Sequence, residues 1–470
     1  MTVLLKRTIS GVALVALLTI LPLDAQTSAP AEAGKVRAPG GAAVAHYAGG
    51  KRVSSRRAKS AAPRGVLYPV GANALEPTMG VAKNGDVFYI ATPSLGAEVM
   101  KSTDNGKSWK PSSPQIASQN SHPVTLDPYI YIDKWTQRIF TIDLTVACSY
   151  LSFSDDGGSN WTTNPLACGV PVNDHQTLFS GPPVSSSPVG YKNLVYYCYN
   201  AIASATNCTK SLDGGLTFIP TGELAYNGFA PEEGDPGGCA GLNGHGVVGS
   251  DGTVYVPKET CDQPLVLISK DEGLSWTSSR VSSMEAVWGP DPSVAVDAKG
   301  NIYYVFIAEK DRLPYLVTST DGGRSWSDPR MIALPGLTET VHATLDVGAP
   351  GKVAVAYYGT DDVDGPMERR DYKDATWNGY MTMTTDALSD RPLFFSASIN
   401  TPSDPLMKGA CGPRRCYDAL DFIDVVIGSD GTPWSAFVAN CFKALCPAPT
   451  PPEGETSGIV GRLTGGPKLR

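Results

Sequence analysis

Seven short segments of the chain open on an ionisable residue and continue into small and β-branched residues. The ionisable residues at or beside these starts are Glu76, Asp127, Asp174, His175, His245, Asp291, His342 and Asp421. The whole chain contains only five histidines, so three of them at such starts is an unusual concentration. Carboxylates and imidazoles that converge can bind a divalent metal or act as acid and base groups toward a ligand. The same residue types also cap strands, so this set is a list of candidates.

A common pattern surrounds these candidates. It reads polar-Pro-x-apolar-x-apolar, then a glycine-containing turn, then an aromatic-rich stretch, and its clearest copies span residues 76–89 and 291–303. Alternating small and β-branched residues beside a glycine turn predict a hairpin. Seven such hairpins can be counted, the last starting near Asp421.

A second repeat, Ser-x-Asp-x-Gly-x-x-Trp/Phe, occurs five times and follows the hairpins. Its Asp, Gly and aromatic positions are Asp104, Gly106, Trp109; Asp156, Gly158, Trp161; Asp213, Gly215, Phe218; Asp271, Gly273, Trp276; and Asp321, Gly323, Trp326. The Ser and Asp side chains can accept hydrogen bonds from backbone N–H groups in a tight turn. The Gly supplies a positive φ, and the aromatic residue anchors the turn to a core. The copies lie roughly 50–58 residues apart, which is the spacing of four-stranded blades with their loops.

These five motifs resemble the Asp box, or BNR repeat, of the sialidase-like β-propellers. In that family the box is a structural turn between the two outer strands of a blade, on the face opposite the active site. The resemblance implies an all-β fold, a single propeller of four-stranded antiparallel blades. Seven hairpins favour seven blades, and six, the number in true sialidases, is the alternative. A sixth, partial box is present at Thr384-Thr-Asp386, and the last hairpin has none.

The chain divides into three parts. Lys6 and Arg7 precede an apolar run over residues 9–23, so residues 1–25 are predicted to be a secretory signal peptide. Residues 26–64 are rich in Ala, Gly, Pro and Ser, which predicts a disordered linker. Residues 65–470 are predicted to form the propeller, with residues 65–70 as the outer strand of a last blade built from residues 421–464. No segment of the mature chain is expected to span a membrane.

Export is consistent with the ten cysteines, an even number that predicts disulfides. The pairs suggested by neighbourhood are Cys148–Cys168, Cys198–Cys208, Cys239–Cys261, Cys411–Cys416 and Cys441–Cys446. The last four cysteines are also compatible with crosswise pairing or with a zinc site. The predicted location is secreted, either extracellular or periplasmic. A net charge of −8 without a basic groove makes the chain a poor nucleic-acid binder.

The resemblance implies sialidase chemistry, in which three arginines hold a carboxylate, a Tyr–Glu pair is the nucleophile and an Asp is the acid/base group. The family's first-arginine motif is not found, and only Arg64 lies near its position. Tyrosines of the right type are Tyr357, Tyr358, Tyr380 and Tyr417, and glutamates of the right type are Glu232, Glu259 and Glu285. None has a motif around it, so no catalytic residue is assigned and whether the chain is an enzyme stays open.

We therefore expect a secreted, sialidase-like propeller that recognises glycans or another extracellular ligand, including a protein. Its ligand is expected where the inner strands begin, around the propeller axis. The alternative is an exo-sialidase-type glycoside hydrolase with a diverged active site. No cofactor is expected, and the alternative is a divalent metal such as calcium, for which Asp361, Asp362 and Asp364 supply carboxylates.

Overall fold

The structure is a computed structural model. It describes residues 43–48, 51–52, 63–92, 97–114, 127–144, 149–167, 173–201, 205–227, 241–287, 289, 291–363, 365–441 and 456–470. The predicted signal peptide and much of the predicted linker lie outside the described residues. No helix within the described ranges is long and apolar enough to span a membrane.

The first four blades are four-stranded antiparallel sheets in which sequence order is also spatial order. Blade 1 consists of β4 (Met79–Val81), β5 (Val87–Ala91), β6 (Glu98–Ser102) and β7 (Lys110–Pro111). Blade 2 consists of β8 (Pro128–Ile132), β9 (Ile139–Leu144), β10 (Ser149–Ser154) and β11 (Thr162–Ala167). Blade 3 consists of β12 (Asp174–Gly181), β13 (Leu194–Asn200), β14 (Thr206–Ser211) and β15 (Ile219–Pro220). Blade 4 consists of β16 (Val247–Val248), β17 (Val254–Thr260), β18 (Gln263–Ser269) and β19 (Thr277–Arg280).

The remaining three blades differ more from one another. Blade 5 consists of β20 (Ser293–Val296), β21 (Ile302–Ile307), β22 (Pro314–Ser319) and β23 (Arg330–Met331). Blade 6 consists of β24 (Glu339–Val347), β25 (Val353–Thr360), β26 (Thr376–Thr384) and β27 (Phe394–Ser398), with the short helix η4 (Met367–Arg369) between β25 and β26. Blade 6 is extended by β1 (Ala43–Ala48), β2 (Lys51–Arg52) and β28 (Met407–Lys408). Blade 7 consists of β29 (Asp424–Ile427), β30 (Pro433–Ala439), β31 (Ser457–Thr464) and β3 (Arg64–Pro69).

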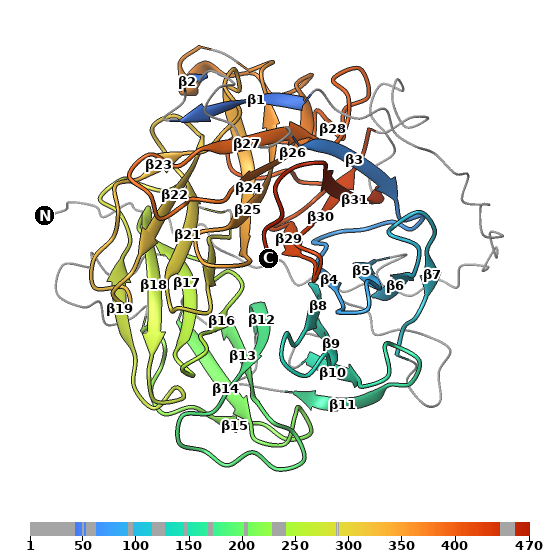
Figure 1. Cartoon of the computed structure of the whole chain (residues 1–470), viewed down its shortest axis with the longest axis vertical. Helices are drawn as coiled ribbons and strands as arrows, with labels where there is room; N and C mark the ends of the chain where they lie inside the picture. The colour runs from blue at the N-terminus through green and yellow to red at the C-terminus, as the bar shows by residue number, and fades with distance from the viewer. Residues whose placement is uncertain are drawn as a thin grey trace, which may run out of the picture. The chain divides into compact units, whose positions relative to one another are not determined.

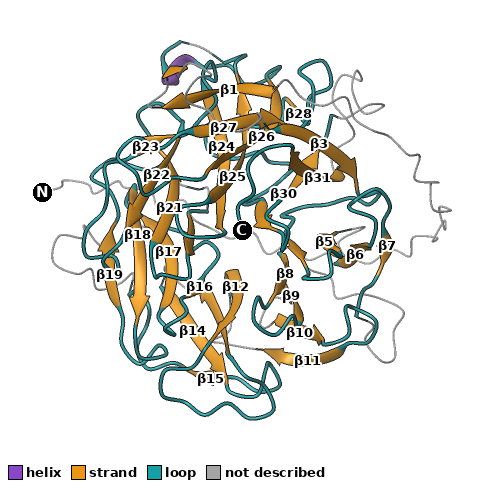
Figure 2. Ribbon diagram, in the orientation of Figure 1, coloured by secondary structure: helices purple, strands orange, loops and turns teal. Residues whose placement is uncertain are grey.

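The all-β propeller is confirmed, with seven blades rather than the alternative six. The blades follow one another around a common axis in Figure 1, and Figure 2 shows that nearly all regular structure is strand. The ring is closed by strands from both ends of the chain. β3 pairs antiparallel with β31, from Arg64 opposite Thr464 to Pro69 opposite Ile459. The predicted closing strand is therefore present.

The repeated motif forms the predicted turn in all five copies. The Ser hydroxyl donates to the Asp Oδ1 atom at 2.7–2.9 Å and accepts the Gly N–H at 2.8–3.0 Å. In the first copy Asp104 Oδ1 also accepts the N–H groups of Lys107 and Ser108. Each Gly has a positive φ, between 81° and 103°, a region that favours glycine. We call these turns the box turns.

The box turns also join neighbouring blades. A group on the outer strand of the preceding blade, or just beyond it, donates to the box glycine carbonyl: Ser112 to Gly158, Asn164 to Gly215, Gly222 to Gly273 and Ser279 to Gly323. The indole N–H of Trp161 in turn donates to the carbonyl of Ser112 at 2.9 Å. Each box therefore closes its own hairpin and stabilises a blade junction. Because third strands run parallel to inner strands, the boxes lie on the face opposite the inner-strand starts.

Two of the predicted disulfides are present, Cys198–Cys208 and Cys411–Cys416. The second excludes crosswise pairing of Cys411 and Cys416 and their use as zinc ligands. Cys261 and Cys441 are also disulfide-bonded. The other three predicted pairs each include a cysteine outside the described residues.

Candidate functional site

One ionisable residue from each blade lies where its inner strand begins. In blade order these residues are Glu76, Asp127, His175, His245, Asp291, His342 and Asp421, and we call them the channel-mouth ring. Direct contacts or charge interactions link every member to at least one other. Asp174, the remaining candidate, is exposed beside the ring.

The backbone is unusual at three ring positions. Glu76, His175 and His342 have φ values of 46°, 46° and 56°, although none is glycine. The inner strands that carry the two histidines have register shifts at these residues, between Asp174 and Thr177 and between Val341 and Thr344. Such irregularities re-aim side chains, and left-handed backbone at non-glycine residues clusters at functional sites.

Asp421 is the hub of the ring. Its backbone N–H donates to Glu76 Oε1 at 3.1 Å, and its carbonyl accepts from His342 Nδ1 at 3.1 Å. Its carboxylate lies 3.4 Å from His175 Nε2 and forms an ion pair with Arg415. Burial would raise the pKa of Asp421, but His175 and Arg415 hold this pKa well below its usual range. Asp421 is therefore a carboxylate whose charge is already paired with His175 and Arg415.

His175 joins blades 3, 5 and 7 across the mouth. Its Nδ1 atom lies 3.0 Å from Asp291 Oδ1, an ion pair whose atoms are not aligned as a hydrogen bond. Burial would lower the pKa of His175, but Asp291 and Asp421 raise it well above its usual value. Burial raises the pKa of Asp291 to about 6 in spite of His175. His175 is thus an imidazolium between two carboxylates.

The other two ring histidines are neutral. His342 Nε2 accepts the N–H of Cys416 at 3.0 Å, so the ring proton is on Nδ1 and is donated to Asp421. Burial lowers the pKa of His342 to about 4 and that of His245 to about 3. The His245 ring contacts Tyr129 and Phe422 edge-on, with centroids 4.8 and 5.0 Å away. Its Nε2 atom has no hydrogen-bond partner within the described ranges.

The acidic pair of blades 1 and 2 completes the ring. Glu76 is buried, and burial together with the charges of Asp127 and Asp421 raises its pKa well above the usual value. Burial likewise raises the pKa of Asp127. The Oε2 atom of Glu76 has no partner in the described part of the chain. Burial and the neighbouring carboxylates therefore both favour the protonated form of Glu76.

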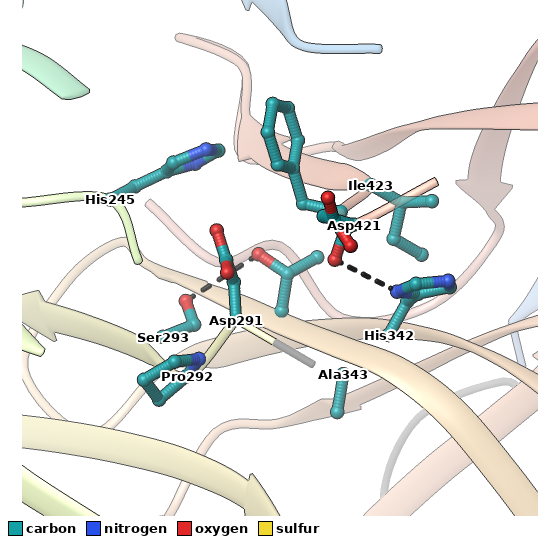
Figure 3. Close-up of a pocket in the computed structure, with 10 residues that line it drawn as sticks. His245, Asp291, Pro292, Ser293, His342, Ala343, Asp421 and Ile423 are labelled. Atoms are coloured by element: carbon teal, nitrogen blue, oxygen red, sulfur yellow. Dashed lines mark hydrogen bonds between the residues drawn. The ribbon is translucent and has the colours of Figure 1, made fainter. Parts of the chain in front are cut away.

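A hollow opens beside the ring members of blades 4 to 7. It is lined by His245, Asp291, Pro292, Ser293, His342, Ala343, Thr344, Asp421, Phe422 and Ile423. In Figure 3 the carboxylates of Asp291 and Asp421 lie between His245 and His342. Asp421 and His342 have protein partners, so Asp291 and His245 are the ring members of the hollow with the fewest partners among the described residues.

The described residues contain no group of three or more His, Cys, Asp or Glu side chains placed to hold a metal ion. In the acidic loop, Asp362 accepts hydrogen bonds from the backbone and side chain of Thr376. Asp361 is exposed, and Asp364 lies outside the described residues.

The structure reveals a second polar cluster that sequence reasoning missed. The Tyr372 hydroxyl lies 3.0 and 2.9 Å from the two carboxylate oxygens of Glu339, and Arg370 Nη1 lies 2.7 Å from Oε2. Glu339 is fully buried, and burial raises the pKa of both Glu339 and Tyr372. Tyr372 and Glu339 have no motif around them, and the only signal was the long loop between β25 and β26.

The tyrosines and glutamates that were selected by residue type differ in how far they are buried. Tyr357 and Tyr358 are fully buried between blades, where Tyr358 donates to the carbonyl of Val438, so they are structural. Tyr380 and Glu259 are also buried, whereas Tyr417 and Glu285 are exposed. Glu232 lies outside the described residues.

No protein-family model matches this chain, and no curated protein matches it. Solved structures with a similar course include a protein of unknown function from Dyadobacter fermentans DSM 18053, at 16% identity over 88% of this chain and 99% of that chain, with a TM-score of 0.44. The leech intramolecular trans-sialidase matches at 13% identity over 84% and 70%, with a TM-score of 0.39. The Aleuria aurantia lectin matches at 10% identity over 69% and 95%, with a TM-score of 0.41. Similarities this distant carry no information about a ligand.

Proposed function

We propose that this protein binds a saccharide in the hollow at the channel mouth, outside the cell. The observation that carries the proposal is the hollow itself, where a carboxylate and a neutral imidazole adjoin Phe422, and the imidazole Nε2 atom has no partner among the residues that the structure describes. Sugars present hydroxyl groups beside apolar C–H faces. Asp291 can accept hydrogen bonds from hydroxyls, and an aromatic ring such as that of Phe422 can pack on the apolar face. The two disulfides fit an oxidising compartment.

The hydrogen bonds and ion pairs within the channel-mouth ring favour binding without catalysis. A general acid or base must be free to exchange its proton with a substrate. His175 and Asp421 are instead held in their charged forms by each other, and His342 has both nitrogens engaged. The ring therefore serves as a rigid support, in which Asp291 and His245 line the hollow.

A second candidate function is glycoside hydrolysis, and one observation favours it. Tyr372 and Glu339 lie within hydrogen-bond reach, which is the geometry of a nucleophile with its activating base. Arg370 beside them is a cation of the type that binds a sugar carboxylate. Asp291, with a pKa of about 6, is suited to act as a general acid at weakly acidic pH.

Two assays on the full-length chain separate the candidates. A glycan array should show binding that Asp291→Asn abolishes, whereas Asp390→Asn, a change at an exposed residue on the opposite face, should leave it intact. Turnover of a fluorogenic sialoside that Tyr372→Phe abolishes would establish the hydrolase instead. A folded protein that binds no glycan and turns over no sialoside would contradict both.

A further inference from the structure

Tyr417 is the one aromatic side chain in the described part of the chain that is largely exposed. Its exposed fraction is 61%, and the other large exposed apolar residues are all Val, Leu or Ile. Buried aromatic residues are explained by packing, but an exposed tyrosine beside a polar hollow is typical of a contact surface.

The tyrosine is held in place by a short covalent loop. The Cys411–Cys416 disulfide closes this loop immediately before Tyr417, whose N–H donates to the carbonyl of Ala410 at 2.7 Å. The ring rests on Gly412, because a Cβ at that position would lie 3.5 Å from Cε2 of Tyr417. The backbone N–H of Cys416 in turn donates a hydrogen bond to Nε2 of His342, a member of the channel-mouth ring. An aromatic surface fixed in this way loses little freedom when a ligand binds.

Arg415 connects Tyr417 to the hollow. Its guanidinium lies 5.8 Å from the centroid of the Tyr417 ring and forms an ion pair with Asp421, which lines the hollow. A guanidinium has five N–H donors. Only Nη1 of Arg415 has an acceptor among the described residues, and 38% of the side chain is exposed. Donors are therefore available between the hollow and the tyrosine.

We infer that Tyr417 and Arg415 form a second saccharide subsite beside the hollow, so that the ligand is an oligosaccharide of at least two residues. One residue occupies the hollow against Asp291 and His245. The next lies with its apolar face on Tyr417 and its oxygens toward Arg415. This inference rests on the proposed function and adds the size of the ligand to it.

Matched sugar pairs test the inference by titration calorimetry on the full-length chain. The probes are galactose and lactose, N-acetylglucosamine and chitobiose, and N-acetylneuraminic acid and 3′-sialyllactose. For the pair that binds, the larger sugar should bind about tenfold tighter than the monosaccharide, the size of one aromatic contact. Tyr417→Ala should remove that advantage without weakening the monosaccharide, and Tyr417→Phe should retain it. Leu274→Ala, at an exposed residue of a box turn on the other face, is the matched control.

Equal affinity for both members of the pair, or an equal loss for both in Tyr417→Ala, would overturn the second subsite while leaving the hollow as the binding site. Binding of none of the six sugars and of no glycan on the array would overturn the proposed function, and the subsite with it. Binding of a protein that Tyr417→Ala abolishes, in the absence of sugar binding, would assign this surface to a protein ligand and also overturn the inference. Because Tyr417 is exposed, its variants should melt as the parent does, which a thermal scan verifies.

Discussion

On the box face, the carboxylate of Asp156 accepts hydrogen bonds from Ser154 and Asn160, and its pKa is lowered to about 2. At the channel mouth, burial raises the pKa of Asp291 to about 6 and that of Glu76 well above its usual value. The two faces both repeat along the chain, with five complete boxes on one and seven ionisable positions on the other, but they repeat in different ways. The box face repeats the same residue types, because every copy forms the same hydrogen-bonded turn. At the channel mouth, the position at the start of each inner strand is repeated, but the residue type differs from blade to blade. This variation is expected where a site is assembled on a repeating scaffold.

The largest expected effect tests whether the mouth is also structural. Replacing His175 by Ala removes the cation between Asp291 and Asp421 and leaves two buried carboxylates facing each other. Breaking a buried ion pair in this way costs about 3–5 kcal/mol. Urea denaturation should show this loss for His175→Ala.

The matched control is His245→Gln, because His245 is neutral and its Nε2 atom has no hydrogen bond to any described residue. It should cost about 1 kcal/mol or less, the loss of its aromatic contacts. Similar costs for the two substitutions would mean that charge is not what holds the ring together.

The second effect is the pH dependence of stability. A buried carboxyl whose folded pKa is raised binds more protons when folded than when unfolded, so its contribution grows as pH falls. Asp143 in blade 2 is such a group, with a pKa raised to about 7 by burial alone. His175 acts in the same direction, because its raised pKa adds stability that is lost as pH rises through that value. We expect stability to increase between pH 8 and pH 6.

Asp143→Asn isolates one part of this dependence. At pH 8 it should stabilise the protein, by an amount on the order of 2–4 kcal/mol for a shift of this size, and the slope between pH 8 and pH 6 should flatten. Thermal melts across this range measure both quantities. His245 and His342, with lowered pKa values, oppose the trend below about pH 6.5, so the rise in stability should become shallower there. A slope of the same steepness in Asp143→Asn would contradict the assignment.

The third effect concerns a complete box. Asp213 Oδ1 accepts the N–H groups of Leu216 and Thr217, and Oδ2 accepts the Thr217 hydroxyl. Asp213→Ala leaves these donors to water and should cost about 1–2 kcal/mol. Glycan binding should not change, because the box lies on the opposite face. A loss of binding in a variant that remains folded would break the separation of the two faces.

Sequence alone was sufficient for the fold and insufficient for the site. The box residues act within a single turn, so their spacing determines their hydrogen bonds and the five copies could be counted. The closing strand could be predicted because an unpaired edge at β31 needs a partner from the other end of the chain. The positions of the channel-mouth ring could be found because they repeat along the sequence. The protonation states of the ring residues could not be found in this way. Whether a histidine is charged, as His175 is, or neutral, as His342 is, depends on which distant blades face it. Tyr372 and Glu339 were missed because they lie 33 residues apart and meet only in three dimensions.

The smallest effect compares a complete box with the partial one of blade 6. There Thr384 Oγ1 donates to Asp386 Oδ1 at 2.8 Å, and Oδ1 also accepts the N–H of Leu393 at 2.9 Å. The box glycine and aromatic are missing, and β1 pairs with the outer strand β27. Asp386→Ala should therefore cost about 0.5–1 kcal/mol, less than Asp213→Ala, because fewer donors lose their acceptor. Urea denaturation of the two variants under the same conditions gives the difference. If Asp386→Ala costs as much as Asp213→Ala, the aromatic and the glycine contribute little to a box, and the Ser–Asp hydrogen bonds alone carry its stability.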